Sequence, residues 1–358
     1  MPLLELALAG VLLVALTFYA LLGGADFGAG VWDLLAFGPR RQAQHALIVN
    51  AISPIWEANH VWLILVIVIL FNAFPPAFAA ISTALYIPLT IMLMGVVLRG
   101  AAFVFRSYGA QTDDVQRWWG RLFAIASIVT PVMLGVCVGA ISAGRIRVEN
   151  GTVTTGYMAP WFAPFPLSVG GFALVIFVFL AAVYLTVEAD EPGLRDDFRL
   201  RALLAAVAVG AMALLVFLLS GEGAPRIRAG LIERPWAWPL QIITSVVAMG
   251  AIWALWARRS YLARAFAAAQ VVLILWGWGA AQFPYLVTPD ITIQNAAAPP
   301  LTLQLLLTFL IAGAVILFPS FYLLFRIFKG ERAFAISGAA PDAADGHAEA
   351  EAHGSSKI

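Results

Sequence analysis

Acidic and basic residues stand in or beside long apolar segments at three places in this sequence. Asp26 lies in the run GGADFGAG, Glu57 in SPIWEANHVW, and Arg99 in LRGAAF. Ionisable side chains at membrane depth are rare, and where they occur they commonly carry protons or ions. We therefore take Asp26 and Glu57, with His60 one turn after Glu57, as candidate proton-transfer residues. Arg99 is a candidate structural charge partner.

A structural explanation competes with proton transfer at each of these positions. Ser53 and Pro54 are typical of a helix start, where the helix macrodipole favours a carboxylate such as Glu57. Asp26 and Arg99 could instead form a salt bridge that holds helices together. The glycines around Asp26 would allow either a sharp turn or the close approach of two backbones.

The composition places the chain in a membrane. Of its 358 residues, 62% are hydrophobic and 11% are charged, whereas soluble domains are about 45 to 50% apolar and about 25% charged. The 21 Lys and Arg residues nearly balance the 20 Asp and Glu residues. A nucleic-acid partner is therefore not expected, because nothing in the charge balance would attract one.

Nine apolar segments are long enough to cross the hydrocarbon core of a bilayer, which takes about 20 helical residues. A turn at Phe74-Pro75-Pro76 should separate the second from the third helix, and Pro88 and Pro131 should kink the third and fourth. We predict an all-α integral membrane fold of nine helices, arranged as two four-helix bundles plus one extra helix. The expected helices cover residues 3–22, 53–73, 77–98, 119–143, 166–187, 200–219, 240–256, 262–281 and 301–325.

The chain should divide into a transmembrane domain and a polar tail. The domain covers residues 1–329, with helices one to four within about 1–143 and helices five to nine within about 165–326. Residues 330–358 are rich in Ala, Gly, Asp and Glu and show no apolar periodicity. This pattern predicts a disordered cytoplasmic tail.

The distribution of positive charge predicts the orientation. Sixteen of the 21 Lys and Arg residues follow odd-numbered helices or lie in the tail. Because such residues accumulate on the cytoplasmic side, we expect the N-terminus outside and the C-terminus inside a bacterial inner membrane. The first apolar segment lacks a basic leader and a small-residue cleavage site, so we expect it to be retained as a helix.

Cofactor motifs limit what the chain can bind. Cys137 is the single cysteine, which excludes an intrachain disulfide, a cysteine zinc site and an iron–sulfur cluster. His45, expected in a loop, and His60 are the histidines of the predicted transmembrane domain, so a haem between two imidazoles is not expected. No nucleotide, covalent-haem or zinc motif occurs, and no metal site is expected. The 12 Trp and 24 Phe residues suit packing or the lining of a quinone slot.

Several of these runs together resemble subunit II of cytochrome bd ubiquinol oxidases. They are GADFGAG around Asp26, WEANHVWLI around Glu57, RGAAF at Arg99, and QFPYLVTPDITIQNAAAP before the last helix. The resemblance implies that Asp26, Glu57 and Arg99 match an acidic, an acidic and an arginine position of the family. Some members have Asp in place of Glu57 and Gln in place of His60, which argues against an essential role for His60.

The resemblance implies a heterodimer that oxidises quinol and reduces dioxygen to water in the respiratory chain. Subunit I would bind haem b and haem d, and this chain would be its haem-poor partner, with a role in assembly and proton uptake. Small accessory subunits and a structural quinone in this subunit are further expectations, although no residue identifies the quinone site.

Two other functions suit a polytopic helical chain. A secondary transporter would place polar groups near the bilayer midplane, whereas the acidic residues here fall at predicted inner helix ends. A purely structural scaffold subunit would share the fold of the oxidase subunit but not its proton transfer. Copurification with a partner that shows haem d absorption would separate an oxidase subunit from a transporter.

Overall fold

The structure is a computed structural model that describes residues 3–52, 56–108 and 113–335, and its regular structure is almost entirely helical. Eight of the described helices are long and apolar enough to cross a membrane, and one bent pair would make a ninth span. The predicted all-α membrane fold is thereby confirmed. Met1–Leu306 form one compact unit, and Leu307–Ile358 belong to a second.

The elements follow one another as a nearly unbroken series of helices with two small antiparallel hairpins. They are α1 (Leu3–Phe18), the π-helix η1 (Tyr19–Gly23), α2 (Gly24–Leu34), α3 (Arg41–Ile52), α4 (Trp56–Ala73), α5 (Pro75–Ala84), α6 (Tyr86–Tyr108), α7 (Asp113–Ser142), β1 (Val148–Glu149), β2 (Thr152–Val153), α8 (Pro164–Glu188), α9 (Pro192–Gly223), α10 (Pro225–Ile232), α11 (Ala237–Trp256), α12 (Ser260–Gln282), β3 (Tyr285–Val287), β4 (Ile291–Thr292) and α13 (Pro300–Ala335).

The first span is longer than the sequence analysis predicts. The expected helix ends at residue 22, but the chain continues through η1 and α2, so that the span covers Leu3–Leu34. The glycines after residue 22 do not form a turn. Gly24, Gly28 and Gly30 lie against neighbouring helices, so these glycines serve the close approach of helices, the second of the two predicted possibilities.

The predicted third helix is wrong at its start. Residues 77–84 belong to α5, which makes an angle of 118° with the preceding helix. The chain turns at Phe74, where the next two residues are prolines that suit the first turn of a helix. Pro88 falls in the first turn of α6 rather than inside a helix, and α6 extends to Tyr108.

The other predicted spans are found with shifted ends. The short helices, the hairpins and the position of His45 were not predicted. α3 and α10 are short helices between spans, and the hairpins β1–β2 and β3–β4 lie in connections. His45 is in α3 and not in a loop. α13 is described as far as Ala335, and the rest of the predicted tail lies outside the described residues.

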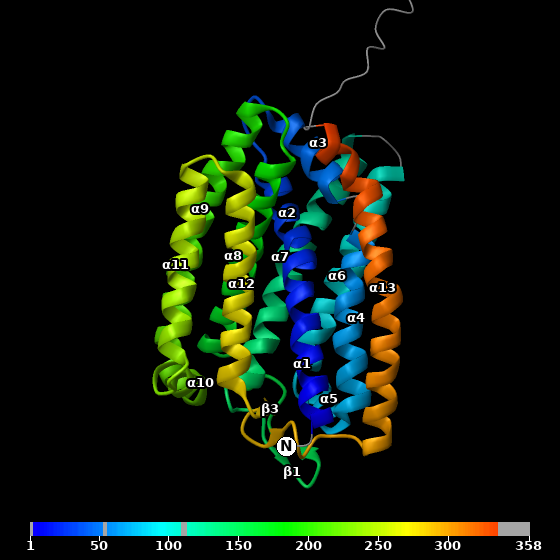
Figure 1. Cartoon of the computed structure of the whole chain (residues 1–358), viewed down its shortest axis with the longest axis vertical. Helices are drawn as coiled ribbons and strands as arrows, with labels where there is room; N and C mark the ends of the chain where they lie inside the picture. Colours follow the sequence, from blue (N-terminus) through cyan, green and yellow to red (C-terminus); the bar gives the residue numbers. More distant parts are fainter. Residues whose placement is uncertain (1–2, 53–55, 109–112, 336–358) are drawn as a thin grey trace, which may run out of the picture. The chain divides into compact units, whose positions relative to one another are not determined.

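α8 is the most buried long helix and packs against α2, α7, α9 and α12. α11 packs on α12, and α6 on α7. Figure 1 shows α3 and the end of α2 at the upper end of this unit, and the two hairpins at the lower end. The division into two four-helix bundles stays a prediction.

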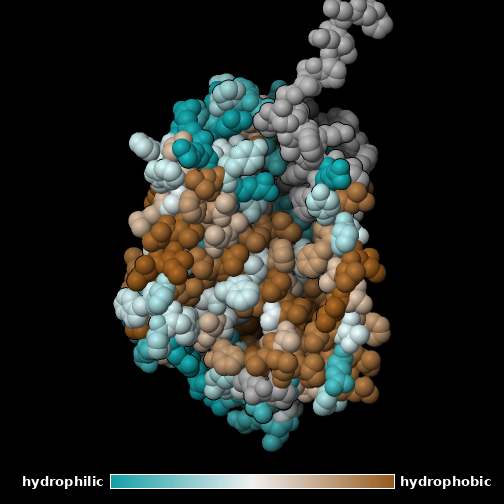
Figure 2. Space-filling view, viewed as in Figure 1, coloured by the Kyte–Doolittle hydropathy of each residue, from teal (hydrophilic) through white to brown (hydrophobic). Residues whose placement is uncertain are grey.

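The surface of the unit suits lipid. Large apolar side chains on α9 and α11 are exposed, among them Leu204, Val207, Ile242, Val246 and Met249. Figure 2 shows hydrophobic residues across the middle of the visible face and hydrophilic residues toward its upper and lower ends. Such a band is expected where a protein faces hydrocarbon.

Candidate functional site

Asp26 is buried in α2 and is contacted from two other helices. Asn59 of α4, which is fully buried, donates from Nδ2 to Asp26 Oδ2 at 2.5 Å. Arg99 of α6 donates from Nη2 to the main-chain carbonyl oxygen of Asp26 at 2.8 Å. The structure therefore brings Asp26 and Arg99 together, with the guanidinium on the main chain and a neutral amide on the carboxylate.

Arg99 is only 2% exposed, and its charge is enclosed by polar and aromatic groups. Its Nε donates to Ser127 Oγ of α7 at 3.2 Å. The guanidinium carbon lies 4.8 Å from the ring centre of Phe27 and 5.0 Å from that of Phe123. Rings at this distance attract a cation through their negative faces. Arg99 thus joins α2, α6 and α7 around the Asp26 backbone.

Glycines set the position of Asp26. A Cβ at Gly28 would lie 2.0 Å from the carbonyl oxygen of Phe177 in α8, and a Cβ at Gly24 would lie 2.5 Å from the Phe177 ring. A Cβ at Gly30 would lie 2.2 Å from Ser127 Oγ. Since any larger residue would push these helices apart, the glycines permit the contact that buries Asp26.

The two remaining predicted residues lie on α4. The His60 ring is 6.0 Å from the Phe27 ring and 6.1 Å from the Tyr19 ring, centre to centre, so it lies next to the Asp26 site. The side chain of Glu57 lies outside the described part of the structure. The roles of both residues in proton transfer stay predictions.

A second buried carboxylate, which the sequence analysis missed, lies farther along α2. Asp33 is 5% exposed. Its Oδ1 is 2.5 Å from Nδ1 of His45 in α3, and its Oδ2 is 2.5 Å from Nη1 of Arg106 in α6. The signal for it was in the sequence, since Asp33 follows Asp26 by seven residues and Arg106 follows Arg99 by seven.

A neighbouring network fixes the other side of α3. Arg40 makes two hydrogen bonds to Asp197 of α9, at 2.6 and 2.9 Å, and the carboxylate raises the pKa of Arg40 above its usual value. Gln44, which is buried, donates to Asp197 at 3.2 Å and accepts from Arg201 at 2.9 Å. α3 is therefore tied to α2 through His45 and to α9 through Gln44.

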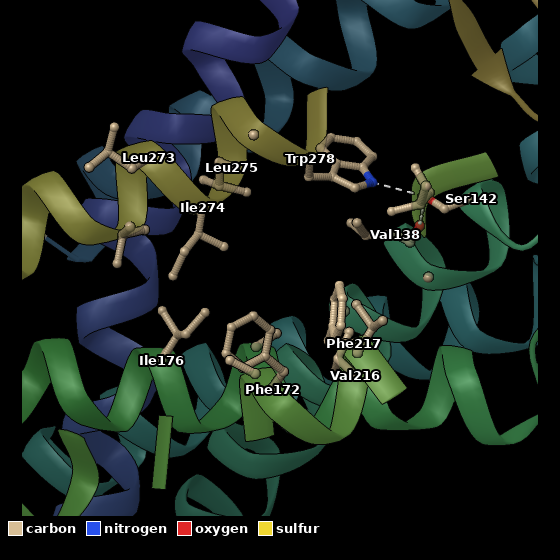
Figure 3. A pocket seen from close by; sticks show the side chains of 18 of the residues that line it. Val138, Ser142, Phe172, Ile176, Val216, Phe217, Leu273, Ile274, Leu275 and Trp278 are labelled. Atoms are coloured by element: carbon tan, nitrogen blue, oxygen red, sulfur yellow. Dashed lines mark hydrogen bonds between the residues drawn. The ribbon is translucent and has the colours of Figure 1, made fainter. Parts of the chain in front are cut away.

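A large apolar cavity lies among α7, α8, α9, α11 and α12. Its volume is about 600 Å³. Figure 3 shows Phe172 and Ile176 of α8, Phe217 of α9 and Ile274 of α12 pointing into it. At one end Trp278 Nε1 donates to Ser142 Oγ at 2.8 Å. Hydrocarbon walls with a few polar groups suit a ligand that has an apolar chain and a small polar head.

The two histidines of the described residues lie against other side chains. Axial ligands are commonly the imidazole of His or the thioether of Met. His45 has both ring nitrogens engaged, Nδ1 with Asp33 and Nε2 with Nε of Arg41 at 3.3 Å. The ring of His60 lies beside the rings of Tyr19 and Phe27.

Comparisons of the sequence with known proteins find one family. The family model described as cytochrome bd terminal oxidase subunit II matches residues 4–328. A putative cytochrome bd menaquinol oxidase subunit II of Bacillus subtilis is 24% identical over 328 residues, which cover 88% of this chain and 93% of that protein. Subunit 2 of the cytochrome bd-I ubiquinol oxidase of Escherichia coli is 28% identical over 218 residues, covering 60% of this chain and 54% of that one.

A solved structure extends this similarity to three dimensions. The bd oxidase from Geobacillus thermodenitrificans matches with a TM-score of 0.73 and 25% sequence identity. The match covers 92% of this chain and 99% of the solved chain. The fold of almost the whole chain is thus similar to that of the solved chain.

Proposed function

Because this chain belongs to the cytochrome bd terminal oxidase subunit II family, we propose that it takes up protons for the oxidase and supports its assembly. The subunit implies a subunit I partner, with quinol and dioxygen as the substrates of the complex. Family membership also removes the interpretation as a secondary transporter. A purely structural scaffold is the remaining alternative.

The observation that carries the proposal is the buried Asp26 carboxylate, whose Oδ2 accepts a hydrogen bond from the neutral amide of Asn59. Asn59 donates to Oδ2 and Arg99 donates to the main-chain oxygen, and both of these acceptor oxygens remain when the carboxyl group is protonated. A buried carboxyl group that is held in place by hydrogen bonds can accept and release a proton. Reduction of dioxygen to water consumes one proton for each electron, so the complex needs such a carrier.

The haem chemistry is assigned to the partner. Haems in the complex would carry electrons from quinol and bind dioxygen, and we place haem b and haem d on subunit I because His45 is engaged at both nitrogens. This chain contributes Asp26 and Glu57 as proton carriers, and Arg99 and Asn59 hold the site together. Small accessory subunits are compatible with this arrangement.

Substitution of the carriers in the two-subunit complex tests the proposal. Glu57→Gln and Asp26→Asn retain size and hydrogen bonding but cannot carry the proton, so assembly and haem content should be unchanged while turnover falls about tenfold or more. Glu57→Asp should be milder. If Glu57→Gln and Asp26→Asn both oxidise quinol and take up protons at the normal rate, the proton-uptake proposal is wrong and the chain is a structural scaffold.

The orientation follows from the same proposal. We place α3, the connections that carry Arg40 and Arg258, and the helix ends that carry Arg106 and Arg199 on the cytoplasmic side, with the N-terminus outside. A reporter fused after Lys329 should then behave as cytoplasmic, and a reporter inserted between Arg145 and Phe165 as external. The opposite pattern would reverse the direction of proton uptake.

We also assign a bound quinone to the apolar cavity. Its isoprenoid chain would lie along the α8 and α9 walls, with the head group near Ser142 and Trp278. Ala213→Phe should fill part of the cavity and reduce the quinone extracted from the purified chain. Leu218→Phe, on the exposed side of the same helix, is the matched control. Equal quinone content in both variants would place the quinone outside this cavity.

A further inference from the structure

Acid and arginine pairs repeat at the same spacing on two helices. Asp26 and Asp33 are seven residues apart on α2, and Arg99 and Arg106 are seven apart on α6. Seven residues make about two helical turns, so each pair lies on one face, about 10 Å apart along its helix. Arg99 contacts the Asp26 residue and Arg106 contacts the Asp33 carboxylate. The result is two layers. The deep layer holds Asp26 and Arg99, and the outer layer, near α3, holds Asp33 and Arg106.

The layer near α3 has a route to solvent through His45. The imidazole is 2.5 Å from Asp33 Oδ1, and the His45 side chain is 25% exposed, compared with 5% for Asp33. An imidazole has two ring nitrogens, so it can take a proton at one and pass a proton on from the other. Arg41, on the same helix, donates from Nε to Nε2 of the ring at 3.3 Å.

The space between the layers holds small and polar groups. Gly30 lies between the two acids on the same face of α2. The Ser127 hydroxyl of α7 fills the notch above Gly30 and also accepts from Arg99 Nε. No side chain projects from α2 at Gly30, so a hydroxyl group takes the place of a side chain between the two carboxylates.

We propose that His45 and Asp33 form the solvent-facing end of the proton route that leads to Asp26. The inference rests on the proposed function, because it needs Asp26 to be a proton carrier. It adds two residues that no family motif named above includes, and it makes α3 part of the proton route.

The proton transfer can be written step by step. Cytoplasmic water protonates His45 at Nε2 when Arg41 swings away, and the ring passes its Nδ1 proton to Asp33 Oδ1. Asp33 is then neutral, with Arg106 still cationic beside it, which favours release of the proton inward toward Asp26. The imidazole left behind carries its proton on Nε2, and rotation of the ring or exchange with water restores the starting form.

Chemical rescue tests this role in the purified two-subunit complex. His45→Ala should assemble with full haem content but slow quinol oxidation about tenfold, and added imidazole should restore much of the rate because a free base can fill the vacated space. His45→Gln keeps a hydrogen bond to Asp33 without carrying a proton, so it should stay slow. Arg40→Ala, in the neighbouring exposed ion pair, should keep the normal rate and show no response to imidazole.

The outcomes separate this inference from the proposed function. A normal rate in His45→Ala, full activity in His45→Gln, or a slow His45→Ala that imidazole does not improve would each overturn the role of His45. Slow Asp26→Asn and Glu57→Gln variants would still support proton uptake by this subunit through another surface point. Those two variants should not respond to imidazole, because their defect lies beyond His45.

Discussion

Asp26 and Asp33 occupy equivalent faces of one helix, but their surroundings differ. Asp26 meets an amide, and the nearby guanidinium of Arg99 bonds to its main chain. Asp33 meets the side chains of Arg106 and His45 directly. Burial favours the neutral form of a carboxylic acid, whereas a cation bonded to the carboxylate favours the ionised form. The difference predicts a deep carboxylate that stores a proton and an outer one that passes it on quickly.

The strongest test of this contrast is Asp33→Asn. Loss of the carboxylate leaves Arg106 and His45 without their shared partner, so we expect destabilisation of about 3 kcal/mol, at the low end for a broken buried ion pair. The low value follows because both partners are about a quarter exposed. Thermal unfolding of the purified complex measures it. Asp26→Asn is the comparison and should cost about 1 kcal/mol, because an amide can replace the acceptor. Equal losses would show that the two surroundings are equivalent.

The second test moves both carboxylates at once. Gly28→Ala puts a methyl group against the Phe177 carbonyl oxygen, so α2 must shift from α8, at a cost of about 1 to 3 kcal/mol. Yield and thermal stability of the complex would report the change. The control is Gly10→Ala in α1, where no atom lies within 4 Å of the added methyl group and the helix should be unharmed. A tolerated Gly28→Ala would mean that the α2–α8 contact is loose.

The smallest effect is expected from the exposed ion pair between Arg40, just before α3, and Asp197 of α9. Arg40→Ala removes two hydrogen bonds to Asp197, but Arg40 is 44% exposed and water can replace them. The unfolding temperature of the complex should stay close to that of the unmodified protein. Asp197→Asn, alone and together with Arg40→Ala, completes a double-mutant cycle. A large coupling between the two would make this pair as important to α3 as Asp33.

The sequence predicts the spans well because each one is a long apolar run, but helix ends depend on contacts between helices. GGADFGAG reads equally as a turn or as a packing surface, and the choice depends on the Phe177 backbone more than 140 residues away. Residues 77–84 are as apolar as a span, yet two prolines and the bend at Phe74 direct them away from α4.

The site was predictable only in part for a similar reason. Asp26 and Arg99 stand out because their neighbours are apolar, and the structure brings them together. Asp33 and Arg106 lie near helix ends, where charges are common, so only the repeated seven-residue spacing distinguishes them. Asn59 is uncharged and carries no such signal, although it makes the contact with the Asp26 carboxylate.

Phe177 faces two regions at once. Its side chain lines the apolar cavity, while its ring lies against Gly24 and its carbonyl oxygen against Gly28 of the helix that carries Asp26. A molecule that displaces α8 from within the cavity therefore also changes the free energy of the helix that positions the carboxylate. By thermodynamic reciprocity, the protonation state of Asp26 must then alter the affinity of the cavity for its occupant by the same factor.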